Sequence, residues 1–219
     1  MSTGNFKQDV YAQLARVAKA IGHANRLELL EFVAQGPRGV DELAAMTKLS
    51  VANASKHLQE LRRAGLVQTR KEGVRVFYEV AGPDVVDLLA ALRTVAETRV
   101  AEVAQLLRTY VTARDDLEPI PAAELMARAK QGLVTVLDVR PSEEYDAGHL
   151  PGAINVTMDA LSGHLKRLPK GREVIAYCRG PYCLLSVDAV ALLREKGYRA
   201  RRLEDGFPEW KASGRPVEN

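Results

Sequence analysis

Hydrophobic positions in the first half of the chain recur every three or four residues, the spacing of amphipathic helices. This periodicity predicts helices over residues 6–21, 25–33, 40–46, 51–64 and 84–110, with a turn at 36–39. Asn25 and Ser50 are expected to cap the second and fourth of these helices, and Gly65 to close the fourth. The β-rich runs 66–70 and 75–80 are expected to pair as a hairpin.

The pattern changes after a polar stretch at residues 112–119, where the domain boundary is predicted. Beyond it we expect strands at 134–139, 174–177 and 201–203, and a helix at 184–196. Alternation of strands and helices predicts an α/β domain with a central parallel sheet. The predicted fold therefore has two domains, a mainly α-helical one over residues 1–112 and an α/β one over 118–219.

The composition is that of a chain with a hydrophobic core. The 219 residues are 47% hydrophobic and 27% charged, which excludes a disordered chain, a collagen-like repeat and a disulfide-stapled mini-protein. No apolar run approaches the roughly 18 residues of a transmembrane helix, and no secretory signal is visible at the start. With two cysteines, the expected location is the reducing cytoplasm, where a disulfide would be a functional event.

A compact basic cluster lies within residues 48–75, where seven lysines and arginines accompany two glutamates. Helix, turn, capped helix and basic hairpin, in that order, are the layout of a winged helix-turn-helix. Ala54, Leu58, Leu61 and Leu66 are expected to face the core. The predicted DNA contacts are Ser50, Val51, Asn53, Ser55, Lys56, His57, Gln59 and Arg62, with Arg70, Lys71 and Arg75 in the hairpin.

This half of the chain resembles the ArsR/SmtB family of bacterial repressors across about residues 5–105. The matching blocks are HANRLELL at 23–30, SVANASKHL at 50–58, LRRAGLV at 61–67 and GVRVFY at 73–78. The resemblance implies a homodimer, built largely from the first and last helices, on a palindromic operator in double-stranded DNA. The alternative for helix 84–110 is packing within its own domain.

Many members of this family sense metals through thiolates or histidines. Here residues 41–50 contain no cysteine, and residues 84–110 contain neither histidine nor cysteine. We therefore expect no metal site and no cofactor in this protein. His23 and His57 are expected to be isolated, the simplest roles being a cap or packing role and a phosphate contact.

Both cysteines lie in the segment VIAYCRGPYCLLS at residues 174–186, where a strand delivers Cys178 to a short loop before a helix. The backbone N–H groups of such a loop and the helix N-terminus stabilise an anion. Arg179 adds positive charge, so the pKa of the Cys178 thiol is expected to fall. The alternative is a pair of buried apolar cysteines without chemistry.

The second half resembles the rhodanese family across about residues 118–219. The matching motifs are LDVRPSEEY at 137–145, GHLPGAIN at 148–155 and LEDGFPEW at 203–210. The resemblance implies that Cys178 is the nucleophile that accepts sulfur. The polar side chains expected to be scaffold, tying the strand end to the following loop, are Asp138, Arg140, Glu144 and His149.

The cysteine loop departs from the usual rhodanese pattern, because glycine is its third residue and Cys183 replaces the closing arginine. Loss of that guanidinium weakens the binding of thiosulfate oxyanions, so we expect at most weak sulfurtransferase activity. Cys183 offers a thiol that can attack a persulfide on Cys178. The predicted reactive site consists of Cys178, Cys183 and Arg179.

These features predict a DNA-binding repressor whose rhodanese-like domain senses persulfide, polysulfide or thiosulfate and releases DNA. One alternative is a sulfurtransferase or thiol-based reductase tethered to a DNA-binding module, and another is a redox sensor that responds to peroxide. Turnover with thiosulfate and cyanide favours the enzyme, whereas release by polysulfide but not by peroxide favours the persulfide sensor. No membrane partner is expected.

Overall fold

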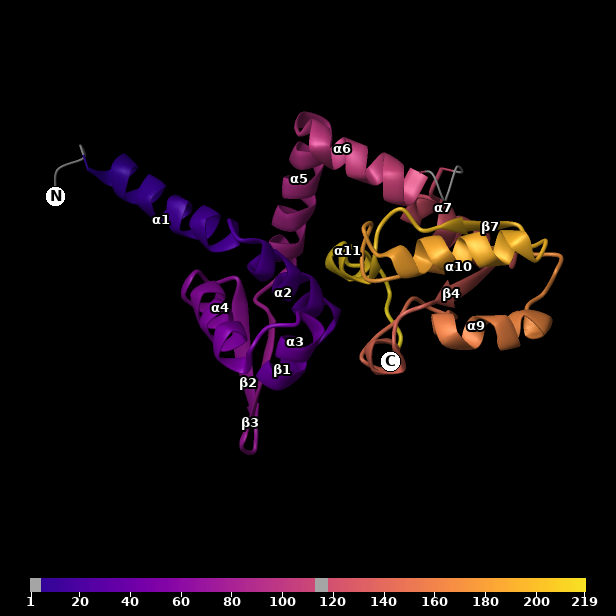
Figure 1. Cartoon of the computed structure of the whole chain (residues 1–219), viewed down its shortest axis with the longest axis horizontal. Coiled ribbons are helices and arrows are strands. Elements are labelled where there is room, and N and C mark those ends of the chain that lie inside the picture. Colours follow the sequence, from indigo (N-terminus) through magenta and orange to yellow (C-terminus); the bar gives the residue numbers. More distant parts are fainter. Residues whose placement is uncertain (1–4, 113–117) are drawn as a thin grey trace. The chain divides into compact units, whose positions relative to one another are not determined.

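The computed structural model of the chain describes residues 5–112 and 118–219. They form two compact units that divide between Val85 and Val86 (Figure 1). Among the described residues, no helix combines the length and the apolar character needed to cross a membrane.

The first unit is a helical domain with a small antiparallel sheet in the order β1-β3-β2. Its elements are α1 (Phe6–Ile21), α2 (Ala24–Gln35), β1 (Arg38–Gly39), α3 (Val40–Met46), α4 (Val51–Arg63), β2 (Val67–Glu72) and β3 (Arg75–Val80). The interior includes wholly buried leucines from three helices, namely Leu29, Leu30, Leu43, Leu58 and Leu61. The helices and the hairpin predicted for residues 6–80 are confirmed to within two residues at most ends.

Two local features of this unit differ from the sequence prediction. His23 caps α2 in place of Asn25, because its Nδ1 accepts a hydrogen bond from the Asn25 backbone N–H at 3.2 Å. The predicted turn at 36–39 ends in strand β1, which pairs with β3. A strand of two residues shows no alternation of polar and apolar side chains, so only its pairing partner reveals it.

The prediction of one continuous helix over 84–110 is wrong. The segment forms α5 (Pro83–Arg99), α6 (Ala101–Leu107) and the π-helical turn η1 (Arg108–Thr112), because Val100 has an extended backbone with φ −112° and ψ 105°. Just before the break, the Thr98 hydroxyl donates to the carbonyl of Thr94 at 2.7 Å. Such back-bonding and β-branched side chains weaken a helix locally, and the apolar stripe alone does not reveal this.

The second unit contains a parallel sheet in the order β5-β4-β6-β7. Its remaining elements are α7 (Ala122–Lys130), β4 (Val134–Asp138), α8 (Ser142–Asp146), β5 (Ile154–Asn155), α9 (Met158–His164), the 3-10 turn η2 (Leu165–Arg167), β6 (Glu173–Tyr177), α10 (Leu184–Glu195), β7 (Ala200–Arg202) and α11 (Phe207–Ala212). Val174 and Ala176 of β6 pack in a cluster with α9 and α10. Ile175 and Tyr177 pack with α7 and α11. Helices therefore cover both faces, which confirms the predicted α/β fold.

The predicted domain boundary falls in a polar stretch, of which residues 113–117 lie outside the described part of the chain. The two compact units divide earlier, so α6 and most of α5 belong to the second unit. The division into residues 1–112 and 118–219 stays a prediction.

Candidate functional site

Helix α4 separates an apolar inner face from a polar outer face. Ala54, Leu58 and Leu61 are wholly buried, as predicted. Ser50 begins the helix, and its Oγ accepts a hydrogen bond from the Asn53 backbone N–H at 3.3 Å. This cap satisfies one of the donors that every helix N-terminus leaves unpaired, so it fixes where the helix starts.

The predicted DNA contacts all lie at the surface of the first unit. The exposed ones are Ser50, Val51, Asn53, Lys56, Gln59 and Arg62 around α4, and Arg70, Lys71 and Arg75 in the hairpin. Ser55 and His57 are half-buried. Within residues 5–112 and 118–219, neither Lys56 nor Arg62 takes part in an ion pair, so both charges are available for phosphates. Contact with DNA stays a prediction for each of these residues.

His23 and His57 form a pair, contrary to the expectation that they are isolated. Their ring centroids are 4.6 Å apart and the ring planes meet at 49°. Burial lowers the pKa of His57, and the neighbouring His23, Arg26 and Lys56 lower it further. The predicted capping role of His23 is confirmed, and the pairing was missed because the two residues are 34 positions apart in the sequence.

The cysteine loop, residues 178–183, joins β6 to α10. Cys178 is only 2% exposed, and Cys183 occupies the N-cap position of α10. The two cysteines form a disulfide across the loop, with their Cα atoms 6.2 Å apart. The Cys183 backbone N–H also donates to the Gly180 carbonyl at 3.1 Å. The predicted approach of the two sulfurs is thus confirmed.

Gly206 supports the cysteine loop from the third rhodanese-like motif. The Phe207 backbone N–H donates to the Cys178 carbonyl at 3.1 Å. A Cβ atom on Gly206 would lie 2.4 Å from the Arg179 carbonyl oxygen and 2.5 Å from the Gly180 Cα. Only glycine permits this approach of two backbones. The motif containing Gly206 was found from the sequence, but its contact with the loop was not.

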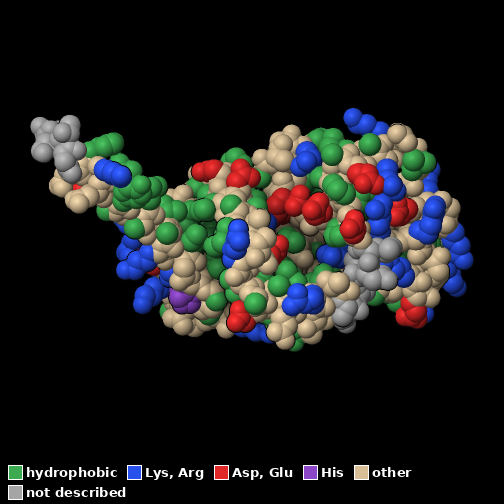
Figure 2. Space-filling view, turned by 90° about the horizontal axis from the view of Figure 1, so that it is seen from above, with side chains coloured by type: hydrophobic (Ala, Val, Ile, Leu, Met, Phe, Trp, Pro, Cys, Tyr) green, Lys and Arg blue, Asp and Glu red, His purple; other side chains and the backbone are tan. Residues whose placement is uncertain are grey.

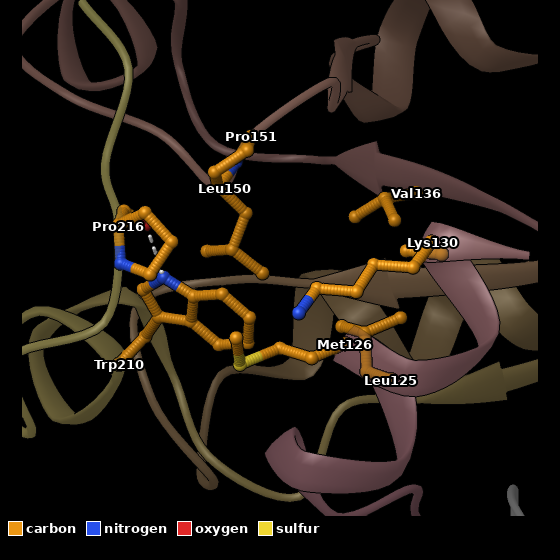
Figure 3. Close-up of a pocket in the computed structure, with 9 residues that line it drawn as sticks. Leu125, Met126, Lys130, Val136, Leu150, Pro151, Trp210 and Pro216 are labelled. Atoms are coloured by element: carbon orange, nitrogen blue, oxygen red, sulfur yellow. Dashed lines mark hydrogen bonds between the residues drawn. The ribbon is translucent and has the colours of Figure 1, made fainter.

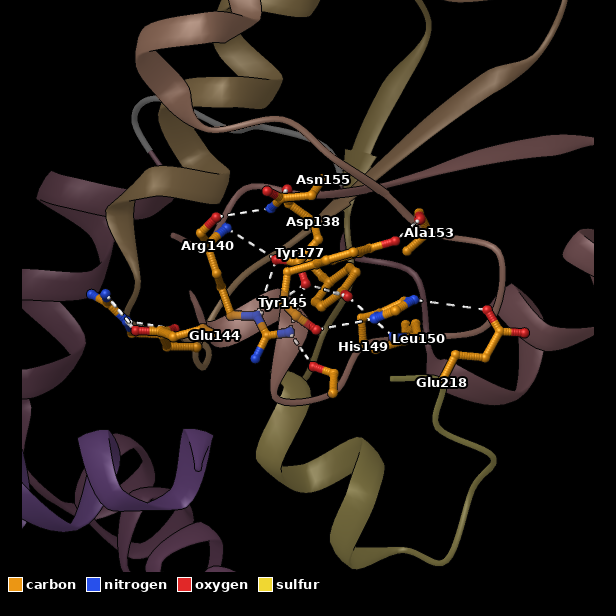
Figure 4. A network of polar contacts seen from close by, with 12 residues as sticks. Asp138, Arg140, Glu144, Tyr145, His149, Leu150, Ala153, Asn155, Tyr177 and Glu218 are labelled. Carbon is orange, nitrogen blue, oxygen red and sulfur yellow. Dashed lines mark hydrogen bonds and ion pairs between the residues drawn. The ribbon is translucent and has the colours of Figure 1, made fainter. Parts of the chain in front are cut away.

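Arg179 directs its guanidinium at a carboxylate. Its Nε lies 2.9 and 3.0 Å from the two oxygens of Glu144, and its Nη2 lies 2.7 Å from one of them (Figure 4). The Glu144 side chain is wholly buried. This ion pair ties the loop to α8 and compensates most of the positive charge. The predicted role of Arg179 toward sulfur stays a prediction.

A buried polar network lies at the carboxyl end of β4 (Figure 4). Arg140 donates from Nη2 to the Asp138 carboxylate at 2.6 Å and to the Gly148 carbonyl at 2.8 Å, and both charged side chains are wholly buried. Burial disfavours the charged form of Arg140. The hydrogen bond and the attraction of Asp138 outweigh this effect and raise the pKa of Arg140. His149 bonds the Tyr145 carbonyl through Nδ1 at 3.0 Å. The predicted scaffold role of these side chains is confirmed.

Tyr182 links the cysteine loop to α5 within the second unit. Its hydroxyl donates to the Glu97 carboxylate at 2.8 Å. Burial, together with the hydrogen bond and charge of Glu97, raises the pKa of Tyr182 to about 12, so the phenol keeps its proton at neutral pH. Arg93, one turn earlier on α5, pairs with Glu209 of α11. Neither contact leaves a signal in the sequence, because the partners lie far apart along the chain.

A small apolar pocket lies elsewhere in the second unit and contains none of the predicted site residues. Its volume is about 110 Å³, and its walls come mainly from α7, the segment around Leu150, and Trp210 (Figure 3). The Trp210 indole N–H donates to the Pro216 carbonyl at 2.8 Å. Within the described residues, no group of three or more metal-binding side chains could hold a metal ion.

Two family models match the parts of the chain that contain α4 and the cysteine loop. Residues 23–69 match the bacterial regulatory protein, arsR family, and residues 121–213 match the rhodanese-like domain. Together with a relative that is similar along nearly the whole chain, they show that the chain belongs to the ArsR-type helix-turn-helix transcriptional regulators that carry a rhodanese-like domain. That relative is the HTH-type transcriptional regulator Rv0324 of Mycobacterium tuberculosis, 43% identical over 206 residues, which are 94% of this chain and 90% of the relative.

Two further relatives cover one part each. A protein named sulfurtransferase from Allochromatium vinosum is 32% identical over 85 residues, 38% of this chain and 78% of its own length. A solution NMR structure of the homodimeric winged helix-turn-helix domain of Mb0332 from Mycobacterium bovis is 38% identical. It covers 46% of this chain and 93% of its own, with a TM-score of 0.43.

Proposed function

We propose that this regulator is a repressor that senses reactive sulfur species through Cys178 and Cys183 and releases DNA when they react. The observation that carries the proposal is the position of the two sulfurs, which are bonded across one short loop at the carboxyl end of β6. Persulfide or polysulfide is the proposed effector, because a rhodanese-type loop presents a cysteine to sulfane sulfur.

The proposed chemistry has two steps. The Cys178 thiolate attacks the sulfane sulfur of a persulfide RSS⁻, forming Cys178–S–S⁻ and releasing the thiolate RS⁻. The Cys183 thiol then attacks Sγ of Cys178, which forms the disulfide and expels HS⁻, the thiol proton leaving with the sulfide. The two cysteine sulfurs are oxidised and the transferred sulfur is reduced to sulfide. A dithiol reductant returns the loop to its starting state.

The proposed route to the DNA-binding unit passes through α5. Tyr182 lies between the two cysteines in the sequence, so closing the disulfide changes the backbone that carries its hydroxyl. That hydroxyl bonds Glu97, and α5 begins at Pro83, directly after the hairpin. A tenfold loss of DNA affinity requires only about 1.4 kcal/mol of difference between the two loop states. The bond between Tyr182 and Glu97 is present with the disulfide closed, and one charge-assisted hydrogen bond contributes a free energy of this order.

The repressor is proposed to act as a homodimer through α1. The apolar side chains along this helix are uncovered in the single chain: Phe6 is 72% exposed, and Tyr11 and Leu14 are each 57% exposed. Val10, on the same stripe, is exposed as well. A contiguous apolar face of this kind is costly in water, and a second copy of α1 would cover it. Two α4 helices would then meet the two halves of a palindromic operator.

A tethered sulfurtransferase is the second candidate, and the 32% identity with the protein named sulfurtransferase favours it. Cys183 in the last loop position argues against efficient turnover, because it replaces a donor for thiosulfate oxygens and closes a disulfide instead. Steady turnover of thiosulfate with cyanide, over many cycles per protein molecule, would favour the enzyme.

The test is operator binding before and after polysulfide, measured by electrophoretic shift on the promoter of its own gene. The wild type is expected to release DNA with polysulfide, with the loop peptide identified by mass spectrometry as persulfide or disulfide. Cys178→Ser is expected to bind DNA and ignore polysulfide, and Cys183→Ser to accept sulfur but respond weakly. An unchanged response in Cys178→Ser would refute the proposal, and release by peroxide alone would leave a plain redox sensor.

Tyr182→Phe tests whether the sulfur reaction of the loop can occur without the signal that releases DNA. The variant lacks only the hydroxyl that bonds Glu97, so the loop is expected to form the same sulfur products at the same rate. DNA release should nevertheless weaken several-fold. Tyr110→Phe, which changes another exposed tyrosine of this unit, is the matched control and should respond like the wild type.

A further inference from the structure

We propose that the second unit carries its own surface for the phosphate backbone of double-stranded DNA. The surface, called the basic end below, lies where the parallel strands β6 and β7 begin. It consists of six exposed side chains: Lys166, Arg167, Lys170, Arg172, Lys196 and Arg199. This inference rests on DNA binding by the family and is independent of the sulfur chemistry.

The topology of the sheet brings the two segments of the basic end together. Arg172 directly precedes β6 and Arg199 directly precedes β7, and these strands are parallel neighbours. The Val174 backbone N–H donates to the Arg199 carbonyl at 2.8 Å, and Arg199 Nη2 lies 3.5 Å from the Gly171 carbonyl oxygen. Residues far apart in sequence therefore form one patch at one edge of the sheet. Figure 2 shows Lys and Arg side chains gathered at the right-hand end of this unit.

The charge of the basic end is largely uncompensated. Its segments 165–172 and 196–199 contain no aspartate or glutamate, although the net charge of the whole chain is only +3. Among residues 5–112 and 118–219, Lys196 is the only member with an ion pair, to its neighbour Glu195. The nearby Glu173 pairs instead with Arg128 and Arg201. Such a concentration of like charge is costly unless a polyanion offsets it.

The chemistry of the basic end fits phosphates better than a protein or a lipid surface. The large apolar residues between its charges, Leu165, Leu168 and Tyr198, are buried, so no aromatic or aliphatic anchor projects. Stable protein interfaces need such anchors, and membrane-bound helices need an exposed apolar face. A DNA backbone requires only positive charge. Because the first unit binds DNA, the covalent connection also raises the concentration of phosphate that the basic end meets.

The basic end and the cysteine loop lie at opposite ends of the same strands. Arg172 precedes β6 and Cys178 follows it. The sulfur reactions of the cysteine loop therefore take place away from the basic end, which would contact DNA. The proposed role is a sequence-independent contact that adds affinity and salt dependence, while α4 supplies the choice of sequence.

The test compares salt dependence in the full chain. Lys166→Gln with Lys170→Gln removes two charges from the basic end. Arg108→Gln with Lys211→Gln removes two exposed charges from elsewhere on the same unit and is the matched control. Binding to a non-operator duplex is measured over a range of salt concentrations, and each phosphate contact contributes about 0.9 to the slope of log K against log salt. The basic-end variant is expected to lose about 1–2 from this slope, and the control to match the wild type.

Two further measurements test the contribution of the basic end to DNA binding. In a Lys56→Glu, Arg62→Glu background, residual DNA binding at low salt should weaken further with the basic-end pair and stay unchanged with the control pair. Unfolding followed by the fluorescence of Trp210 verifies that each variant is folded. Equal slopes for both pairs would overturn the proposal. Loss of binding to phosphatidylserine vesicles with an unchanged DNA slope would also overturn it, and would assign the surface to membranes.

Discussion

Gly206 illustrates how a single residue sets the geometry of the cysteine loop. Gly206→Ala is expected to lower the free energy of unfolding of the second unit by about 1–3 kcal/mol, the range for overpacking, because the new methyl group collides with the Arg179 carbonyl. Urea unfolding followed by Trp210 fluorescence measures the change. Gly163→Ala in α9 is the control, since nothing lies within 4 Å of its added Cβ. Equal stability of the two variants would contradict the close approach.

His57 gives a prediction about pH. Its pKa is lowered from 6.5, so the folded chain binds this proton less readily than the unfolded chain. The contribution of neutral His57 to the free energy of unfolding is therefore present above about pH 6.5. It is lost as the pH falls through the pKa of His57 in the folded chain. NMR titration should place the pKa of His57 below 6.5.

His23→Asn tests the cause of that shift while keeping a good helix cap. The pKa of His57 should rise toward 6.5 without reaching it, because burial, the largest cause, remains. An unchanged pKa of His57 in His23→Asn would show that the pairing seen in the structure does not persist in solution.

For single residues, the predictions from the sequence were right where the interaction is local and incomplete where the partner is distant. Ser50 caps α4 as predicted because capping acts within three residues. Arg179 was correctly associated with the cysteine loop, but its partner Glu144 is 35 positions away and no local pattern connects them. The same distance effect hid the bond between Tyr182 and Glu97.

At the scale of elements, periodicity predicted the helices of the first unit, α10 and the longer strands, whereas α7, α8, α9 and α11 were not predicted. The two-residue strands β1 and β5 were missed because only pairing defines them. The break at Val100 was missed because an apolar stripe can continue across a change of helix direction. Strand–helix alternation predicted the parallel sheet, but the order β5-β4-β6-β7 depends on contacts that the pattern does not contain.

Helix α4 is the element on which sequence-specific DNA binding should depend. Lys56→Glu with Arg62→Glu is expected to abolish operator binding at physiological salt, and with it the preference for operator over unrelated DNA, because both exposed side chains would then repel phosphates and keep α4 from the bases. Fluorescence anisotropy with operator and scrambled duplexes measures this preference. Arg108→Glu with Lys211→Glu should retain it. A charge-reversed α4 that still prefers the operator would place recognition on another element.

At the scale of the whole molecule, the chain consists of two units with separate buried clusters. Asp138→Asn is expected to destabilise the second unit by about 3–5 kcal/mol, because it leaves the charge of Arg140 buried without its partner. Thermal unfolding followed by Trp210 fluorescence reports this transition. DNA affinity, measured where both units are folded, should change less than twofold.

Replacing both charged partners provides the control for this prediction. Asp138→Asn with Arg140→Met should recover part of the lost stability, since no unpaired charge then remains buried. A loss below about 1 kcal/mol in Asp138→Asn alone would mean that the pair is dispensable. A parallel loss of DNA affinity would mean that this buried pair also supports DNA binding by the first unit.

Strand β6 separates the basic end from the cysteine loop, so that charges at these two places interact only weakly. From Arg172 to Cys178 the chain advances six residues, about 20 Å at 3.3 Å per residue. At an effective dielectric constant of about 20, unit charges at this separation interact by roughly 0.8 kcal/mol before salt screens them further. This energy corresponds to less than a tenfold change in affinity. A charge gained or lost on sulfur therefore cannot release DNA from the basic end by its electric field alone. Any signal from the cysteines has to travel through bonded or packed atoms.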